Sequence, residues 1–381
     1  MAQPVSKATL LTIPVELRYA IYDLIFYPTV GRQPLLHVCR QIREEALTIL
    51  LHFVRFFDSL PKLASWASRG PAHLRHLIRV VDVNCLESSL TPFRDWHRHL
   101  IPGTEIAPGS WEATYLSRVG KLESLTSGKA SVMQKLKHAV SRGPGEPVRR
   151  FAETLTLLPG IRKISLTLSG NYDVDDQDPL IVEQGLVLEM VARLLPDLRH
   201  LEFQAGPVTL EFLSHAANLR RLEFTGYAAT GPDETLRILL GLPKLEALVL
   251  RRPPSSNDLD NGMESEGLTR KLAVTPEVVE KLNPLKEVHL MHFAGELKSE
   301  FVTGAMLRAI AAHASTLEVL HVDHDGVMAD DAATALKALL PQLVSLKKLD
   351  LDFVLSEQLA GHYDIRDVIP SNVRILNLRT F

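Results

Sequence analysis

The stretch LEVLHV at residues 317–322 has the same form as LKKLDL at residues 346–351. Each begins with a leucine, places a second leucine after two variable residues, and places a third apolar residue after one more. The pattern occurs eight times in the chain, at Ile161/Ile164/Leu166, Leu198/Leu201/Phe203, Leu219/Leu222/Phe224, Leu245/Leu248/Leu250, Leu285/Val288/Leu290, Leu317/Leu320/Val322, Leu346/Leu349/Leu351 and Val373/Leu376/Leu378. Successive copies start 21 to 40 residues apart, which is the range of repeats that stack into a solenoid. A more diverged ninth copy is Ile78/Val81/Val83.

The segments between the copies have helical rather than strand periodicity, as in Leu236, Leu239 and Leu240. Carboxylates such as Asp233 precede these segments, where they favour a helix N-terminus, and prolines such as Pro243 follow them, where they end a helix. The sequence therefore predicts an α/β fold: an irregular leucine-rich-repeat solenoid with parallel strands on the concave side and helices on the convex side.

Composition excludes several functional classes. The 42 Lys+Arg residues against 45 Asp+Glu give a net charge of −3, so we expect neither nucleic acid nor a membrane as a partner. The two cysteines have no paired spacing, no apolar run is long enough for a membrane helix, and no secretion signal precedes the repeats. A cytoplasmic or nuclear location is expected. No motif predicts a cofactor.

The repeats set the domain boundaries. A helical module is predicted at residues 8–55 and the solenoid at residues 74–381. Prolines and glycines break the repeat pattern at about residues 91–159, which predicts a helical insertion of unknown role. A stretch poor in apolar residues predicts a mobile loop at about residues 252–275.

Two amphipathic helices are predicted before the repeats. Leu17, Ile21, Leu24 and Ile25 form one apolar face behind Pro14, which suits a first helical position. In the second helix, one side carries Leu35, Val38, Ile42, Ala46, Ile49, Leu50 and Phe53.

At these helices the sequence resembles the F-box family. The opening Ile13-Pro14-Val15-Glu16 and the later stretch from Val38 to Arg43 are similar to the leucine-proline-x-glutamate and valine-cysteine-arginine motifs of F-box-like modules in fungal proteins. The resemblance covers roughly the first 55 residues, and leucine-rich repeats often follow such modules.

The resemblance implies that the module docks on a Skp-type adaptor of a cullin-RING ubiquitin ligase while the repeats hold a protein substrate. Because a small helical module must leave apolar surface for a partner, the expected adaptor contacts are Leu11, Ile13, Pro14, Leu17, Ile21 and Ile25. The alternative is that these six residues cap the open end of the repeat core.

Within each repeat, the variable residues around the second and third apolar positions are expected to face the concave side, because side chains alternate along a strand. The predicted substrate-binding residues are Glu202, Glu223, Arg251, His289, His321, Asp323, Asp350, Asp352 and Arg379. The surplus of carboxylates predicts an acidic groove with a basic rim, and the arginines also fit a phosphorylated substrate.

Chemistry by the chain itself has little support in the sequence. The residues from His321 to Asp325 include histidines and aspartates that could bind a metal ion, but no ligand pair has the spacing of a structural zinc site. No nucleophile elbow, phosphate-binding loop or zinc-protease helix is present, so no catalytic residue and no metal ligand is predicted. Two hypotheses are carried forward: a substrate-recognition subunit of a ubiquitin ligase, and an adaptor-independent leucine-rich scaffold. A third, an enzyme with an unrecognised site, would require convergent catalytic side chains that the sequence does not place.

Overall fold

The computed structural model describes residues 10–26, 38–56, 60–69, 72–85, 146–168, 179–206, 208–252, 271–292, 301–355 and 365–380. Ten strands form one sheet in which every neighbouring pair is parallel. In spatial order they are β1 (Phe53–Phe56), β2 (Val80–Cys85), β3 (Lys163–Leu168), β4 (His200–Gln204), β5 (Arg221–Phe224), β7 (Ala247–Arg252), β9 (Glu287–His292), β10 (Val319–Met328), β11 (Lys348–Leu355) and β12 (Ile375–Thr380). A separate antiparallel pair joins β6 (Tyr227–Ala228) to β8 (Lys271–Leu272).

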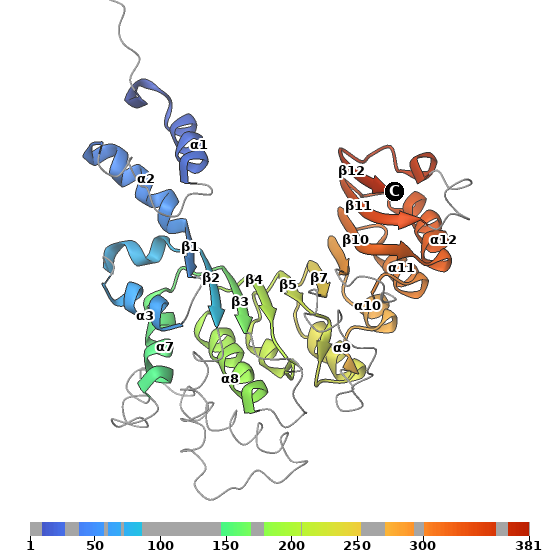
Figure 1. The fold of residues 1–381 in the computed structure, drawn as a ribbon, viewed down its shortest axis with the longest axis horizontal. Helices are drawn as coiled ribbons and strands as arrows, with labels where there is room; N and C mark the ends of the chain where they lie inside the picture. The colour runs from blue at the N-terminus through green and yellow to red at the C-terminus, as the bar shows by residue number, and fades with distance from the viewer. Residues whose placement is uncertain are drawn as a thin grey trace, which may run out of the picture.

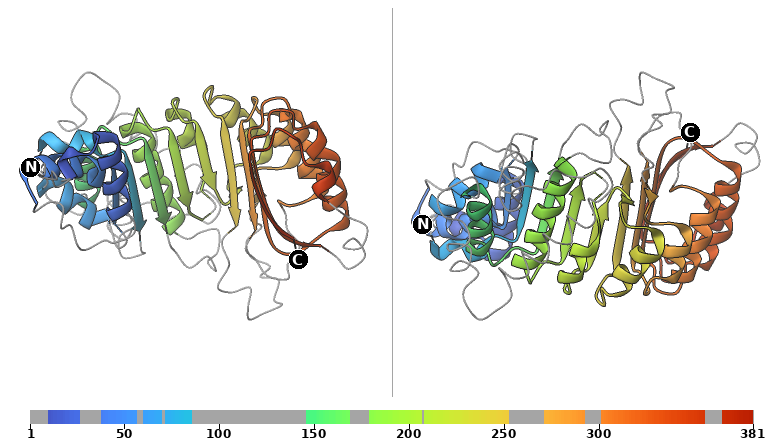
Figure 2. Two further views of the ribbon diagram at one scale, coloured as in Figure 1. Left: turned by 90° about the horizontal axis from the view of Figure 1, so that it is seen from above. Right: turned by 90° about the horizontal axis from the view of Figure 1, so that it is seen from below.

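Helices alternate with the strands and cover one side of the sheet. They are α3 (Leu60–Arg69), α7 (Glu146–Leu157), α8 (Pro179–Leu194), α9 (Pro232–Leu240), α10 (Pro276–Lys281), α11 (Gly304–Ile310) and α12 (Asp330–Leu339), with short 3-10 turns η3 (Ala72–Leu77), η4 (Glu211–His215), η5 (Ala311–His313), η6 (Leu340–Gln342) and η7 (Ile365–Val368). Figure 1 shows an arc with the strands on its inner side and the helices on its outer side. Figure 2 shows the row of strands from above and the helices from below.

The repeated apolar residues form the core between the two layers. Leu317, Leu320 and Val322 are fully buried, and the equivalent positions of the copies from β3 to β11 are at most 4% exposed. Each strand predicted from the pattern, including the diverged copy at β2, is present. The predicted α/β class is therefore confirmed.

A backbone hydrogen-bond ladder fixes the register of successive strands. In each copy, the residue after the first apolar position donates its N–H to the carbonyl of the same position in the preceding copy, as from Arg199 to Arg162 at 2.8 Å and from Arg220 to Arg199 at 2.7 Å. The same bond recurs down to Arg374 and Lys347 at 2.8 Å. Every copy therefore starts level with its neighbours.

Local signals start and end the helices. Gly231 is the N-cap of α9, Pro232 occupies its first turn, and Asp233 follows where a carboxylate meets the positive helix end. In α11 the side chain of Thr303 accepts a hydrogen bond from the N–H of Met306 at 3.1 Å. The Thr303 cap satisfies an N–H group that no helical carbonyl can reach, whereas Gly231 provides no side-chain hydrogen bond.

Two predicted boundaries need correction. The second N-terminal helix, α2 (Arg40–His52), begins after Val38, which is 59% exposed, and ends before Phe53. Phe53 instead starts β1, because Phe53 to Phe56 pair with Val80 to Val83 of β2. Backbone pairing with the sheet edge overrides the helical pattern of apolar residues there.

Parts of the two interruptions predicted from the sequence form regular structure. Residues 146–157 of the predicted insertion form α7, whose Phe151 and Leu155 are buried in the main core next to α3. Residues 86–145 lie outside the described part. Of the predicted mobile loop, residues 253–270 lie outside the described part, whereas Lys271–Leu272 form β8.

The predicted N-terminal module contains α1 (Val15–Phe26), a preceding 3-10 turn η1 (Leu10–Thr12) and α2. These elements stand at the β1 end of the sheet, beyond the arc (Figure 1). Tyr22, Ile42 and Ala46 form a small core of their own, separate from the core under the sheet.

Candidate functional site

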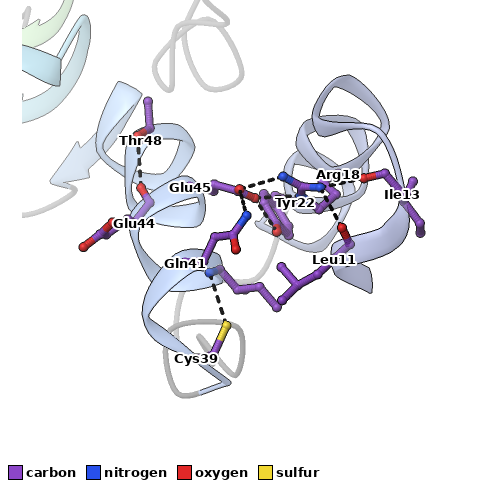
Figure 3. Close-up of polar contacts among 10 residues, drawn as sticks. Leu11, Ile13, Arg18, Tyr22, Cys39, Gln41, Glu44, Glu45 and Thr48 are labelled. Atoms are coloured by element: carbon purple, nitrogen blue, oxygen red, sulfur yellow. Dashed lines mark hydrogen bonds and ion pairs between the residues drawn. The ribbon is translucent and has the colours of Figure 1, made fainter. Parts of the chain in front are cut away.

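The two helices of the N-terminal module are joined by a polar cluster around Arg18. Its guanidinium donates from Nε to Oε2 of Glu45 at 2.8 Å and from Nη2 to Oε1 at 2.7 Å, which is the bidentate geometry that suits an arginine and a carboxylate. The remaining nitrogen, Nη1, donates to the carbonyl oxygens of Ile13 at 2.5 Å and Leu11 at 3.4 Å (Figure 3). One side chain thus fixes the turn before α1, α1 itself and α2.

Two further side chains complete the cluster by donating to Glu45. The Tyr22 hydroxyl lies 3.0 Å from Oε2 and the Gln41 amide 3.1 Å from Oε1. The Arg18 guanidinium, followed by Gln41 and Tyr22, lowers the pKa of Glu45 from 4.5 to about 2. Burial, together with the nearby carboxylate, raises the pKa of Tyr22. The module is held by this polar cluster as much as by its three buried apolar residues.

Several apolar side chains of the module are exposed on η1 and α1. Of the predicted adaptor contacts, Leu11, Pro14 and Leu17 are exposed, with Leu17 at 56%, while Ile13 and Ile21 are half-buried. The side chain of Ile25 lies outside the described residues. The sequence pattern did not predict two further exposed residues, Val15 and Tyr19. They occupy positions on α1 that helical periodicity separates from the predicted apolar face, so they lie on another side of the helix.

The strand register brings most of the predicted concave residues into two rows. One row contains Glu202, Glu223, Val249, His289, His321, Asp350 and Asn377 on successive strands from β4 to β12. The second, two residues further along each strand, contains Arg251, Met291, Asp323, Asp352 and Arg379 from β7 to β12. The predicted residues whose side chains are described therefore share one surface, which is the inner side of the arc in Figure 1, while the side chain of Arg379 lies outside the described residues.

In the first half of this face the charges neutralise one another. Glu223, whose side chain is only 5% exposed, lies 2.6 Å from Nη2 of Arg251 and 3.6 Å from Nη2 of Arg221. Glu202 lies 3.5 Å from Nζ of Lys163 and 3.6 Å from Nη1 of Arg251. Burial pushes the pKa of Glu223 upwards, but the neighbouring His200 and the arginines outweigh it and the net shift is downwards.

A longer ion pair crosses the middle of the face. Arg221 of β5 reaches Glu287 of β9 by passing over β7, where the small residue Ala247 occupies the register position between them. His289 lies 2.7 Å from the same carboxylate. His289 and then Arg221 lower the pKa of Glu287 to about 2 against the opposing effect of burial. The predicted acidic groove is therefore neutralised by its own cations over β3 to β9.

The second half of the face is richer in histidine and aspartate. The rings of His289 and His321 lie 5.1 Å apart, and His321 lies 4.0 Å from Asp323. Asn377 donates to Asp350 at 3.3 Å. Burial lowers the pKa of His321, with Asp350 opposing it.

A metal site can be tested against these geometries. Within the described residues, ligand atoms of His200, Glu202 and Glu223 lie within 4.8 Å of one another. Arg251 contacts both carboxylates, and Lys163 contacts one of them. A divalent ion would have to displace these cations, so the arrangement fits an ion-pair network better than a metal site. The hollow beside it, between Ser165 and Arg251, holds about 40 Å³, little more than one water molecule and far below a small-molecule pocket.

No protein-family model matches this sequence, and no curated protein is significantly similar to it. Among the described helices, none has the length and apolar composition needed to cross a membrane.

Proposed function

We propose that this protein is the substrate-recognition subunit of an SCF-type ubiquitin ligase, in which the N-terminal module docks on a Skp-type adaptor, with a cullin as scaffold, and the sheet holds a protein substrate. The proposal includes the finer architecture: the sheet is a leucine-rich-repeat solenoid with an F-box-like module at its first strand. It is supported by the apolar repeat pattern, the common strand register and the motif residues around Pro14 and Cys39.

The exposed apolar surface of α1 is the observation that carries the proposal. If the module only capped the repeat core, its apolar residues would be buried against β1. Leu11 is instead 42% exposed and Leu17 56% exposed, and the module has a separate core around Tyr22. Large apolar side chains that the described part of the chain leaves exposed are typical of a protein-binding site.

The rigid attachment of this surface supports the same function. Arg18 binds the carbonyl groups of Leu11 and Ile13, so the turn that carries these side chains is fixed before a partner arrives. Prior ordering reduces the entropy cost of association.

The alternative, an adaptor-independent scaffold, uses the concave face alone. It is favoured by the extent of that face, which continues over nine strands from β2 to β12 with polar and charged residues at its surface. The two functions differ in whether the module has a partner.

Co-purification of the full chain with a purified Skp-type adaptor separates them. We expect the native chain to retain the adaptor and Pro14→Ala/Leu17→Asp to lose it, because burying a leucine contributes about 1.5–3 kcal/mol and a buried carboxylate adds a desolvation cost. Val344→Asp is the matched control, since Val344 is 68% exposed but lies beside β11 at the other end of the sheet. Lack of adaptor binding by the native chain, or equal loss in both variants, contradicts the proposal.

A further inference from the structure

One column of charged residues runs along the edge of the sheet at the amino-terminal ends of the strands. It is formed by the residue after the first apolar position of each repeat, which is charged in all nine copies: Arg79, Arg162, Arg199, Arg220, Glu246, Lys286, Glu318, Lys347 and Arg374. The backbone ladder described above holds these residues level, so neighbours are one strand spacing apart, about 4.8 Å. We call it the edge column.

From β5 to β11 the sign of the charge alternates along the edge column. Glu246 lies 3.8 Å from Arg220 and 3.2 Å from Lys286, and Glu318 lies 2.7 Å from Lys347. Opposite charges on adjacent strands stabilise a sheet, whereas like charges destabilise it. From β5 to β11, each charged residue of the column therefore pairs with an oppositely charged neighbour in the column.

The first half does not alternate. Arg79, Arg162, Arg199 and Arg220 are four consecutive cations, and both Arg162 and Arg199 are exposed. Arg79 donates to the carbonyl of Gly160 at 3.0 Å, and Arg220 pairs with Glu246. Within the described residues, neither the Arg162 nor the Arg199 side chain makes an ion pair or a hydrogen bond.

We propose that Arg162 and Arg199, flanked by Arg79 and Arg220, bind a short acidic segment of a protein partner. The fold places unneutralised arginines side by side here, whereas every cation of the column from β5 to β11 pairs with a carboxylate. Lys347 and Arg374 on β11 and β12 are also adjacent cations, but Lys347 pairs with Glu318. An acidic ligand supplies the missing counter-charges through charge-assisted, bidentate hydrogen bonds to the guanidinium groups. Asp197, two residues before Arg199 in the chain, is exposed and pairs with neither Arg162 nor Arg199, so the four arginines still outnumber it.

The length of the cationic run identifies the class of ligand. Three strand spacings are about 14 Å, which an extended peptide covers in about four residues. A longer polyanion such as nucleic acid would continue along the column to Glu246 and Glu318 and would meet a chain of net charge −3. The site is separate from the module and does not depend on adaptor docking.

Fluorescence anisotropy with the full chain tests this site, using a labelled peptide of five glutamates and, as the uncharged comparison, a peptide of five glutamines. We expect the native chain to bind the glutamate peptide, with affinity that falls as salt rises, and Arg162→Gln/Arg199→Gln to weaken binding about tenfold or more. Lys286→Gln/Lys347→Gln removes the same charge from the alternating part of the same column. It should change affinity by less than about twofold, because those lysines already have carboxylate partners.

Thermal melting of both variants gives an independent measurement. Removing two unpaired, mutually repelling arginines should leave the Tm unchanged or higher, whereas removing two paired lysines should lower it. Three results overturn the proposal: no binding by the native chain at low salt, equal loss of binding in the two double variants, or tighter binding of a single-stranded oligonucleotide of eight nucleotides than of the glutamate peptide. A lower Tm for the arginine variant than for the lysine variant also contradicts it.

Discussion

Substitution of Glu45 by glutamine tests how the N-terminal module is held together. The change keeps the size of the side chain but removes the charge that pairs with Arg18 and accepts from Tyr22 and Gln41. Hydrogen bonds to charged groups contribute about 1.5–3 kcal/mol each. The Arg18 and Glu45 side chains are 8% and 14% exposed, the pair is only partly buried, and Arg18 keeps its two carbonyl acceptors, so we expect a loss at the upper end of this range, about 3 kcal/mol.

That loss is large for so small a unit. Among the described side chains of the module, the apolar core consists of Tyr22, Ile42 and Ala46, which together contribute about 5 kcal/mol of apolar stabilisation. A loss of about 3 kcal/mol raises the population of the opened module about a hundredfold. The main core under the sheet shares no residue with this cluster and should not respond.

Hydrogen exchange followed by mass spectrometry measures the two regions separately. Peptides from α1 and α2 in Glu45→Gln should exchange about a hundredfold faster, while peptides from β10 and β11 keep their native rates. Glu44→Gln is the matched control on the same helix, because Glu44 pairs with Arg40 in solvent at 63% and 91% exposure and should change exchange by less than about threefold. Unchanged exchange in Glu45→Gln, or equal acceleration in both variants, refutes this reasoning.

Acid provides a second perturbation of the same carboxylate. The pKa of Glu45 is lowered from 4.5 to about 2 in the folded module, so the folded state binds this proton less readily than the unfolded chain does. The stabilisation is therefore complete above about pH 4.5 and is lost as the pH falls towards 2. Exchange of α1 peptides in the native chain should approach that of Glu45→Gln over this interval, and no convergence would contradict the assigned pairing.

Two further predictions concern the sheet. Gly226→Ala should lower the free energy of unfolding by about 2–4 kcal/mol in thermal or denaturant unfolding, because Gly226 has φ of 82° and an added Cβ would lie 2.5 Å from Cζ of Phe301. The control is Gly231→Ala, where an added Cβ would have no atom within 4 Å and the free energy of unfolding should change by less than about 1 kcal/mol. Arg251→Met should lower the free energy of unfolding by about 1–3 kcal/mol at neutral pH and raise the pKa of Glu223. The difference in stability between variant and native chain should therefore shrink in acid, where Glu223 becomes protonated. A difference that does not change with pH would show that the ion pair does not stabilise the fold.

Most of the fold could be predicted from the sequence, because leucines at fixed spacing indicate both where each strand lies and which of its residues are buried. Leu320 and Leu349 are predicted and found in the core on neighbouring strands. The pattern could not predict β1, since Phe53 also continues the apolar face of α2, and only pairing with Val80 makes it a strand.

The candidate sites were less predictable, because charge pairing depends on side chains from different repeats. Counting residues indicated an acidic groove, but Glu202 and Glu223 already contact Arg251 across strands. The Arg18–Glu45 pair joins residues 27 positions apart and has no local signal. The charged residue after each first leucine was visible in the sequence, yet its significance required the strand register that places Arg162 beside Arg199.

The most direct test of the proposed function is hydrogen exchange on the full chain with and without a purified Skp-type adaptor. The account predicts protection of peptides covering η1 and α1, residues 10–26, with no change on the concave strands β9 to β11. Protection on those strands, or no protection anywhere at adaptor concentrations of about 10 μM, where even a micromolar complex would be mostly formed, would contradict it.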